Sequence, residues 1–385
     1  MKFALVLICA GGYAWAADAP WAWSGEFSSR AATVLLVGDI NIEQRADPAS
    51  AFEHVRETLN HADLVYGNLE GLLVPSEGPD KDIPDKSGWQ HIGPEAVKAL
   101  KAGNIKVAGV ANNVAYGPAN IMKSLAVLDK NGILHTGAGP NIDAAHKPAI
   151  VTVKGIRIGF LQYTAKWYLE EEQIATATRP GVARIKSQDG TSIDAGDLER
   201  LRADIRALRP LVDIVVVSSH NRDGGGRPLA APGTNPERAA ADPRLLTSPI
   251  TLGPSFSHAE EYEKALAHAA IDAGADIVYG HGSHVVQGVE VYQGKPVMYC
   301  LGNFATDWIR MRPNKEGLVA RVMVDGKKVL RVSLVPVTRD AEHNNVLMLD
   351  PSQGEGAKLL QKVKDLSGSM ELKVDEREAV LVEGR

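Results

Sequence analysis

The sequence predicts one large α/β domain in which two mostly parallel sheets pack face to face, with helices on the outside. Three observations predict this class. Short β-branched runs alternate with helical patterns through most of the 385 residues. Runs as apolar as Ile214 to Val217 indicate strands buried on both faces. The balance of 44% hydrophobic and 23% charged residues is that of a folded protein with a sizeable core.

Two groups of strands are expected. The first group alternates with helices, which is typical of βαβ units: Thr33 to Val37, Leu64 to Tyr66, Lys106 to Val110, Asp213 to Val217 and Asp276 to Tyr279. The second group is separated by tight turns such as Lys154-Gly155, which indicates the meandering strands of a second sheet: Ala149 to Val153, Arg157 to Tyr163, Val285 to Tyr292, Pro296 to Leu301 and Leu318 to Val324.

The helices between the strands are expected from their end signals. Several helical patterns have Pro or an acidic residue near the start and Gly just beyond the end, as at Gly103, Gly132 and Gly274. The predicted helices are Pro94 to Ala102, Pro118 to Lys130, Ala195 to Leu208 and His258 to Ala273.

The predicted domain covers residues 31–340, and residues 341–385 are expected to close the same domain. In this last part a helical pattern, Gly356 to Leu366, precedes an alternating end, Met370 to Val382, which predicts a helix and a hairpin. Two stretches without periodicity, Glu77 to Ser87 and Asn221 to Pro254, are predicted to be long loops.

The N-terminus has the pattern of a signal peptide over residues 1–16. Lys2 supplies the positive charge, Phe3 to Ala10 is a short apolar run, and Ala14-Trp15-Ala16 is a small-x-small cleavage site. The mature chain is therefore expected to begin near Ala17 and to reside in the periplasm or outside the cell. Only Cys300 then remains, so no intramolecular disulfide is expected.

The charge of the chain excludes one class of partner. A formal net charge of −5 and a pI of about 6.1 argue against binding to nucleic acid through counterion release. No block of Lys and Arg contradicts this.

Polar residues follow five of the expected strands, at the edge where open α/β sheets place their ligands. They are Gly38-Asp39-Ile40-Asn41, Gly67-Asn68-Leu69-Glu70, Ala111-Asn112-Asn113, Ser218-Ser219-His220 and Gly280-His281-Gly282-Ser283-His284. Each strand end thus supplies a candidate metal ligand.

Carboxylates, amide oxygens and imidazoles together suit divalent ions such as Mn²⁺, Fe²⁺ or Zn²⁺. Two neighbouring ions are expected because this set is too large for one open catalytic site, and Glu70 is the candidate to bridge them. Such a pair lowers the pKa of a bound water and clamps the oxygens of a transferred phosphoryl group.

Each of these residues also has a structural explanation when taken alone. Asp39 could cap the next segment, Asn112 and Asn113 could be turn residues, and His220 could be a core histidine. The two imidazoles in His281-Gly282-Ser283-His284 favour a metal site, because they are three residues apart and converge easily on one ion. The other histidines are interpreted as structural: His54, His61, His91, His135, His146, His258, His268 and His343.

Taken in order, these motifs resemble the bacterial capsule-synthesis CapA family. The resemblance continues through Gly274-Ala275-Asp276-Ile277-Val278 and Gly294-Lys295-Pro296 to Leu301-Gly302-Asn303-Phe304, and it covers about residues 33 to 340. It implies a calcineurin-like four-layer α/β/β/α sandwich of the metallophosphoesterase superfamily. It also implies a role in making or anchoring capsular polysaccharide or poly-γ-glutamate at the cell envelope, with a membrane-associated synthesis complex as a candidate partner.

The resemblance also implies the site residues. The expected metal ligands are Asp39, Glu70, Asn113, His220, His281 and His284. His220 and Asn112 are the catalytic candidates, and Asn68 lies beside them. The expected substrate is an envelope polymer, a phosphoester or a peptide.

Two departures from the family pattern bear on activity. Val114 stands where the family has a histidine after the paired asparagines, and in related phosphoesterases that imidazole helps to protonate the leaving group. A missing general acid costs on the order of 10² to 10⁴ in rate. Asn221-Arg222-Asp223 replaces an expected aromatic-Gly pair. Tyr116 is a candidate substitute for the imidazole, although an exposed loop aromatic is the simpler interpretation.

Three functions therefore remain open. The leading hypothesis is an exported metal-dependent hydrolase-like protein that acts on a phosphoester or an amide-type bond. The second is a non-catalytic polymer-binding or assembly protein on the same fold, which Val114 motivates. The third is a metal-dependent epimerase-type enzyme that abstracts a proton beside a peptide carbonyl.

Overall fold

The computed structural model describes residues 29–43, 45–75, 91–165, 173–188, 191–221, 252, 254–308, 311–368, 370, 372–374 and 378–383. The predicted signal peptide at residues 1–16 and the predicted loop from Glu77 to Ser87 lie outside the described residues. So does nearly all of the predicted loop from Asn221 to Pro254, including Arg222.

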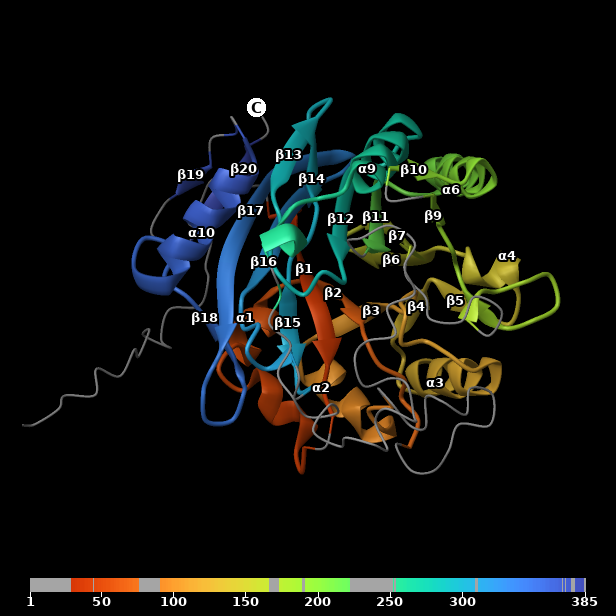
Figure 1. Cartoon of the computed structure of the whole chain (residues 1–385), viewed down its shortest axis with the longest axis horizontal. Coiled ribbons are helices and arrows are strands. Elements are labelled where there is room, and N and C mark those ends of the chain that lie inside the picture. The colour runs from red at the N-terminus through yellow and green to blue at the C-terminus, as the bar shows by residue number, and fades with distance from the viewer. Residues whose placement is uncertain are drawn as a thin grey trace, which may run out of the picture.

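The larger sheet has ten strands among the described residues, in the order β19-β20-β17-β16-β1-β2-β3-β4, with β15 beside β1 and β18 beside β17 (Figure 1). Neighbours from β1 to β4 are parallel, whereas β16, β17 and β20 continue the sheet in antiparallel fashion. The strands are β1 (Ala32–Asn41), β2 (Leu64–Leu69), β3 (Ile105–Gly109), β4 (Leu134–Thr136), β15 (Asn303–Thr306), β16 (Gly317–Asp325), β17 (Lys328–Arg339), β18 (Val346–Met348), β19 (Lys373–Val374) and β20 (Ala379–Glu383).

The smaller sheet has six strands in the order β13-β14-β12-β11-β7-β6. The four central strands are parallel, and the two edge strands run antiparallel to them. These strands are β6 (Ala149–Val153), β7 (Ile156–Thr164), β11 (Ile214–His220), β12 (Ile277–His281), β13 (Val289–Tyr292) and β14 (Lys295–Met298). Two short ribbons lie outside both sheets: β5 (Ala138–Gly139) with β8 (Gly181–Val182), and β9 (Ser187–Gln188) with β10 (Ser192–Ile193).

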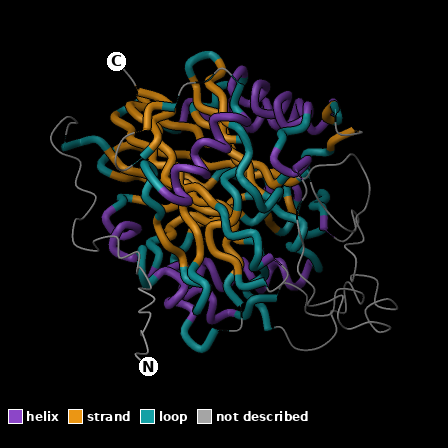
Figure 2. The backbone as a smooth tube through the Cα atoms, turned by 60° about the vertical axis from the view of Figure 1, so that its left-hand side comes forward, coloured by secondary structure: helices purple, strands orange, loops and turns teal. Residues whose placement is uncertain are grey.

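Helices cover the outer faces of the two sheets (Figure 2), except α10, whose Leu359, Leu360 and Val363 pack into the core between the sheets. Leu59, Leu100 and Leu125 of α1, α2 and α3 pack on the larger sheet, and Leu201 and Leu266 of α6 and α9 pack on the smaller one. The helical elements are η1 (Pro48–Phe52), α1 (Arg56–His61), η3 (Pro94–Ala96), α2 (Val97–Ala102), α3 (Pro118–Lys130), α4 (Ile142–Ala145), α6 (Ala195–Leu208), η4 (Arg209–Leu211), η5 (Pro254–Ser257), α9 (Glu261–Asp272) and α10 (Gly354–Leu366).

Successive side chains along a strand lie in two different hydrophobic cores, which shows that the sheet is covered on both faces. In β1, Val34 and Leu36 face the core between the sheets, while Leu35 and Val37 face the helices. Because successive strand side chains point to opposite faces, one apolar run can fill two cores. With the third core under α6 and α9, the described residues form the predicted four-layer α/β/β/α sandwich.

The predicted division of strands between the sheets was wrong. The runs Asp213 to Val217 and Asp276 to Tyr279 correspond to β11 and β12 of the smaller sheet, where β11 pairs with both β7 and β12. Leu318 to Val324 forms β16, which pairs antiparallel with β1 in the larger sheet. Both sheets contain strand-helix-strand units. The presence of a helix between two strands therefore does not predict which of the two sheets those strands join.

The element positions otherwise agree closely with the prediction. The helices expected at Pro118 to Lys130 and Ala195 to Leu208 have those bounds as α3 and α6. The C-terminal helix and hairpin are present as α10 and β19–β20, and the hairpin extends the larger sheet next to β17. Strand β17, with 12 residues, was not predicted. No helix among the described residues is long and apolar enough to cross a membrane.

Candidate metal centre

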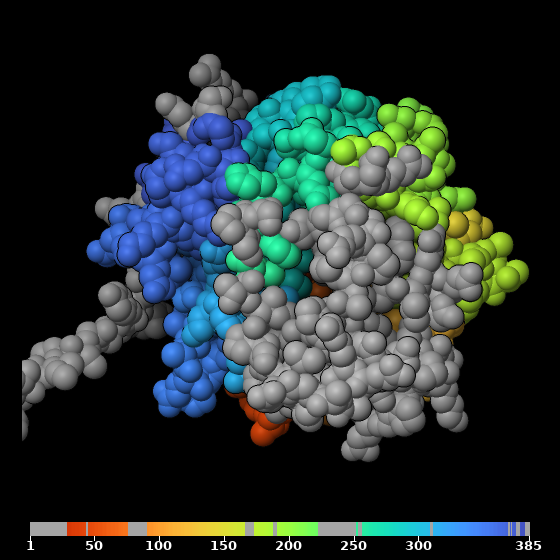
Figure 3. All heavy atoms as spheres, viewed as in Figure 1, coloured from red at the N-terminus to blue at the C-terminus, as the bar shows by residue number. Residues whose placement is uncertain are grey.

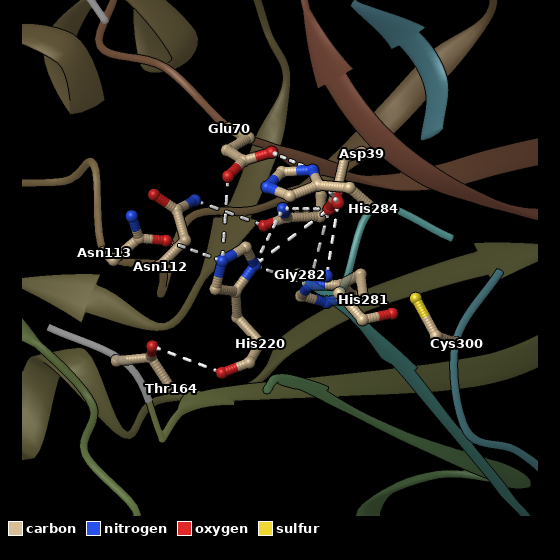
Figure 4. Close-up of polar contacts among 12 residues, drawn as sticks. Asp39, Glu70, Asn112, Asn113, Thr164, His220, His281, Gly282, His284 and Cys300 are labelled. Carbon is tan, nitrogen blue, oxygen red and sulfur yellow. Dashed lines mark hydrogen bonds and ion pairs between the residues drawn. The ribbon is translucent and has the colours of Figure 1, made fainter. Parts of the chain in front are cut away.

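The candidate centre comprises Asp39, Glu70, Asn113, His220, His281 and His284, and it lies where strand ends of both sheets meet (Figure 4). Asp39 is in β1, His220 ends β11, and His281 ends β12. Parallel pairing sets His220 directly beside His281. The strands run further than predicted, so that three of these side chains are inside strands and not past their ends. All six side chains are buried, with at most 6% of any residue exposed.

Two overlapping groups of ligand-type side chains share Asp39. One group is Asp39, His220 and His281, and the other is Asp39, Glu70 and His284. Within each group, one ligand atom from every residue lies within 4.8 Å of the others. The sharing of one carboxylate between two groups is the arrangement that two neighbouring ions require.

The distances from the Asp39 oxygens to the three imidazoles are too long for hydrogen bonds, whereas the Nδ1 atoms of His220 and His281 lie 3.0 Å apart, within hydrogen-bond distance of each other. Nδ1 of His220 and Nδ1 of His281 lie 4.0 and 3.8 Å from Asp39 Oδ1, and Nδ1 of His284 lies 3.5 Å from Asp39 Oδ2. Hydrogen bonds between nitrogen and oxygen are about 2.7–3.2 Å long. Two ligand atoms that are each about 2.1 Å from one tetrahedral ion lie about 3.4 Å apart. The separations therefore fit atoms that face a common cation.

Glu70 and Asn113 close the other side of the candidate centre. Oε1 of Glu70 lies 3.7 Å from Nε2 of His220, and its Oε2 lies 3.7 Å from Nδ1 of His284. Oδ1 of Asn113 lies 2.7 Å from the same Nε2 of His220. Glu70 thus reaches toward both groups, as expected for a bridging carboxylate, although Asp39 is the residue that belongs to both.

The turn after β12 brings the second and third histidines together. Gly282 has φ +100°, and a Cβ atom there would lie 2.4 Å from the carbonyl oxygen of Asn221. Its backbone N–H donates to Asp39 Oδ2 at 3.1 Å. His284 itself has φ +62°, a conformation that non-glycine residues adopt rarely and that is held at functional sites by surrounding contacts. The His-Gly-Ser-His spacing therefore folds so that both imidazoles face Asp39.

A chain of amides fixes the ligand-type side chains. Nδ2 of Asn68 donates to Asp39 Oδ1 at 2.7 Å, and Oδ1 of Asn68 accepts from Nε2 of Gln162 at 2.9 Å. Asn112 donates to Asn68 Oδ1 at 3.2 Å and to the carbonyl of Leu69 at 2.8 Å. These contacts make Asn112 and Asn68 positioning residues for the end of β2, because hydrogen bonds to ligating side chains orient them.

Two residues of this surrounding shell were missed by the sequence analysis. Gln162 bonds to Asn68 and lies 3.0 Å from Nε2 of His281, and Oδ1 of Asn303 lies 3.0 Å from Nδ1 of His284. The signal for Gln162 was available, because a lone amide in the buried run Phe160-Leu161-Gln162-Tyr163 must find polar partners. Asn303 lies in the motif Leu301-Gly302-Asn303-Phe304, but the sequence did not predict that it contacts a candidate metal ligand.

The donor atoms of the candidate centre are oxygen and nitrogen only. Cys300 is free and buried nearby, and its Sγ accepts from the backbone N–H of Gly302 at 3.3 Å. Burial raises the pKa of the Cys300 thiol to about 12, so it stays protonated at neutral pH. A thiolate-free set of carboxylate, amide and imidazole suits Mn²⁺, Fe²⁺ or Zn²⁺. The residues present thus fit a divalent ion.

The segment after Asn113 is buried against the protein. Val114 is 2% exposed and donates its backbone N–H to Asn112 Oδ1 at 3.2 Å. Tyr116 is 1% exposed and stacks on His91, with ring centroids 5.3 Å apart. The interpretation of Tyr116 as an exposed loop aromatic was therefore wrong. The apolar run Val114-Ala115-Tyr116 lacked the polarity of a solvated loop, and that was the available signal.

A protein-family model described as "Bacterial capsule synthesis protein PGA_cap" matches residues 33–241 and 250–308. The match takes in more than half of the chain and every residue of the candidate centre. The chain belongs to this family. The predicted resemblance to capsule-synthesis proteins of the CapA type is confirmed, and the two packed sheets with their outer helices form the predicted four-layer sandwich.

Curated relatives of this PGA_cap chain come from several bacteria. It is 27% identical over 347 residues to the capsule biosynthesis protein CapA of Bacillus anthracis, covering 84% of this chain and 74% of that one. It is 27% identical over 321 residues to the PGA biosynthesis protein CapA of Bacillus subtilis (strain 168), covering 80% and 72%. An uncharacterised protein of Sinorhizobium fredii, y4sH, is 28% identical over 314 residues, covering 72% and 67%.

Solved structures with a similar arrangement are more distant in sequence. A phosphatase from Mycoplasma pneumoniae gives a TM-score of 0.43 at 11% identity and covers 86% of this chain and 99% of that chain. A putative 5'-nucleotidase from Staphylococcus aureus gives a TM-score of 0.40 at 13% identity and covers 87% and 58%.

Proposed function

We propose that this PGA_cap protein is an exported, metal-dependent hydrolase-like protein in the synthesis of capsule, poly-γ-glutamate or another envelope polymer. The observation that carries the proposal is the pair of ligand groups that share Asp39. Membership of the family supports a role in polymer synthesis, and the candidate centre supports a metal-dependent reaction. The substrate proposed is a phosphoester or an amide-type bond of such a polymer.

The proposed ligands are the six residues of the candidate centre. Divalent ions held there would supply Lewis-acid chemistry, lowering the pKa of a water and polarising the bond to be broken. Buried carboxylates are costly unless they are paired or coordinate a metal, and Asp39 and Glu70 are both buried. This cost supports a cation as part of the folded protein.

His220 is the proposed catalytic residue. Its Nδ1 faces Asp39 and His281, at 4.0 and 3.0 Å, whereas its Nε2 faces Asn113 and Glu70, at 2.7 and 3.7 Å. One ring nitrogen of His220 can therefore bind a metal ion while the other holds a proton near the reacting group. Asn112, the second catalytic candidate, acts in this proposal by positioning Asn68 and the end of β2 and not on the substrate.

Metal content tests the proposal directly. Elemental analysis should find about two equivalents of Mn, Fe or Zn in the native protein, as a two-metal site requires. Asp39→Ala should lose both and His281→Ala at least one, while His146→Ala, a buried histidine elsewhere, should keep both. Less than about a tenth of an equivalent in the native protein after incubation with Mn²⁺ or Zn²⁺ would reject the catalytic proposal.

A non-catalytic binding or assembly role is the second candidate, and Val114 is the observation that favours it. If turnover was lost with the imidazole, Val114→His should raise phosphoester hydrolysis by about 10² or more. Tight metal binding with no turnover in either form, on phosphoesters or γ-glutamyl amides, would favour assembly. Solvent deuterium appearing in an unhydrolysed peptide would instead indicate the epimerase-type reaction.

Export is proposed from the N-terminal pattern. N-terminal sequencing of the protein recovered from the periplasm or medium should start near Ala17. Recovery of the intact N-terminus from the cytoplasm alone would contradict export.

A further inference from the structure

Arg339, the last residue of β17, is a buried cation near the candidate centre. The C-terminal part of the chain, coloured blue in Figure 3, forms one side of the molecular surface. Arg339 belongs to this part but is only 2% exposed, and no carboxylate lies at ion-pair distance from it among the described residues. Burial lowers the pKa of Arg339 to about 10, so the guanidinium stays charged at neutral pH. A buried charge without a counter-charge is costly, and the hydrogen bonds of Arg339 must offset that cost.

The Arg339 guanidinium joins two connections between strands. Its Nη2 donates to the carbonyl oxygens of Asn314 at 2.8 Å and of Met311 at 3.4 Å, both in the connection from β15 to β16. Its Nε donates to Oδ1 of Asn344 at 3.1 Å, in the connection from β17 to β18. Nδ2 of Asn344 in turn donates to the carbonyl oxygen of Thr306, the last residue of β15. Because an arginine carries five N–H donors in a rigid plane, one side chain can fix all of these points.

The carbonyl oxygen of Asn314 links Arg339 to the candidate centre. It accepts a second hydrogen bond, from Nδ2 of Asn303 at 3.2 Å. The same Nδ2 donates to the backbone carbonyl of His284 at 3.3 Å, and Oδ1 of Asn303 lies 3.0 Å from Nδ1 of His284. Since both N–H groups of this amide are engaged, Asn303 presents only its oxygen to the imidazole. Arg339 therefore reaches a candidate metal ligand through one carbonyl and one amide.

The two ligand groups of the candidate centre are held by different supports. His220 and His281 end neighbouring parallel strands of the smaller sheet, so the register of the strands holds them side by side. His284 lies beyond β12, in the turn where its own φ is +62°. The contacts that start from Arg339 lead to His284. A change at Arg339 should therefore act on the ligand group that contains His284 and spare the other.

We propose that Arg339 is a positioning residue for the ion bound by the ligand group that contains His284. The guanidinium fixes the carbonyl of Asn314, this carbonyl fixes the amide of Asn303, and the amide holds the imidazole toward the two carboxylates. The inference deepens the proposed function, because it rests on a centre with two ions. Arg339 itself lies beyond residue 308, where the match to the family model ends.

Titration of the metal-free, full-length protein with Mn²⁺ against a competing chelator tests the proposal. The native protein should bind about two equivalents. Arg339→Met should weaken the binding of one equivalent by about tenfold, the lower end of the range for an orienting contact, and leave the other unchanged. Arg321→Met is the matched control, because Arg321 is also buried but pairs with Glu378 at 3.8 Å, on β16. It should keep both affinities.

A conservative variant guards against misfolding. Arg339→Lys keeps the positive charge, but a single ammonium group is a point charge and cannot replace the planar fork. It should weaken the same equivalent by a smaller factor. Equal weakening of both equivalents in the Arg339 variants, or of neither, would overturn the proposal. So would an equal effect of Arg321→Met, which would trace the change to a general loss of stability.

A second measurement needs no metal. In the metal-free protein labelled with ¹⁵N-histidine, NMR at one pH should show the ring nitrogens of His284 shifted by Arg339→Met, with those of His281 unchanged. Variants His284→Gln and His281→Gln identify the two sets of signals. A native protein that binds no metal would reject the proposed function alone. Unmoved His284 signals would reject the role of Arg339, whether or not the native protein binds metal.

Discussion

Two groups of histidine and carboxylate can be compared in this protein, one partly buried and one fully buried, and they differ in the distances between their polar atoms. In the first, Asp204 accepts from the hydroxyl of Tyr163 at 3.0 Å and lies 2.7 Å from Nδ1 of His146. We call these three residues the α6 cluster. In the candidate centre, three imidazoles face Asp39 at 3.5–4.0 Å. In the α6 cluster the carboxylate is at hydrogen-bond distance from both partners, whereas in the candidate centre Asp39 and the imidazoles have the spacing of atoms that face a common ion.

The difference shows how a structural polar cluster can be told from an ion site. In the α6 cluster the Tyr163 hydroxyl and Nδ1 of His146 both lie at hydrogen-bond distance from Asp204. Burial together with Asp204 raises the pKa of Tyr163, so that its hydroxyl remains a donor. In the candidate centre, by contrast, the distances from the Asp39 oxygens to the three imidazoles are 3.5–4.0 Å, longer than hydrogen bonds. Both groups combine histidine with a carboxylate, and the spacing between the carboxylate and the imidazoles distinguishes them.

Removing the Asp39 carboxylate should have the largest effect on metal binding, because Asp39 belongs to both ligand groups. Mn²⁺ at about 100 times its dissociation constant stabilises a folded protein by about 2.7 kcal/mol. Adding it to the metal-free native protein should raise Tm by several degrees, and Asp39→Ala should show no rise. Calorimetry with and without the ion measures this. Equal rises in both proteins would mean that the ion binds elsewhere.

Asn303 tests whether the shell around the candidate centre behaves like that of a metal site. Asn303→Ala removes the oxygen that lies 3.0 Å from Nδ1 of His284. Loss of such an orienting contact weakens metal affinity by about 10- to 100-fold. Titration with a competing chelator measures the change, and Asn141→Ala, at the start of α4, is the control. Unchanged affinity would mean that Asn303 only packs against the turn.

The sequence was sufficient for the layers and for most of the candidate centre. Apolar runs of four or more residues predicted buried strands, and the polar residues at their ends predicted the convergence of Asp39, His220 and His281. The assignment of strands to sheets could not be predicted, because it depends on which edges pair after both sheets form. Strand β17 was missed because Lys328, Arg331 and Arg339 interrupt its apolar pattern, although Arg339 is buried.

The contacts around the candidate centre were harder to predict for a different reason. Gln162 and Asn303 come from strands in different sheets and approach the histidines only when the sheets are packed. Their spacing along the chain carries no sign of this.

The α6 cluster should respond through stability alone. Asp204→Asn keeps one acceptor oxygen but loses the carboxylate, so unfolding should become easier by about 1 kcal/mol, the net value of a hydrogen bond. Urea denaturation measures the loss, and metal content should stay unchanged. The exposed Asp143 provides the control Asp143→Asn. Loss of metal from Asp204→Asn would remove the distinction between the two groups.

Glu43 offers the smallest and sharpest test, because it is a largely buried carboxyl that belongs to neither group. Burial, with a further contribution from Asp307, raises the pKa of Glu43 from 4.5 to about 7. Between these values the folded protein holds a proton that the unfolded chain has released, so stability falls as pH rises. Glu43→Gln should flatten this fall.

Urea midpoints at about pH 5 and about pH 7.5, on either side of most of this window, measure the slope. Glu57→Gln, exposed on α1, should keep the native slope. If Glu43→Gln also kept it, the carboxyl would be charged in the folded protein and paired with a cation. Glu43 would then be an ionised, largely buried carboxylate outside the candidate centre. The distances between Asp39 and the imidazoles would no longer be needed to explain how such a carboxylate stays ionised.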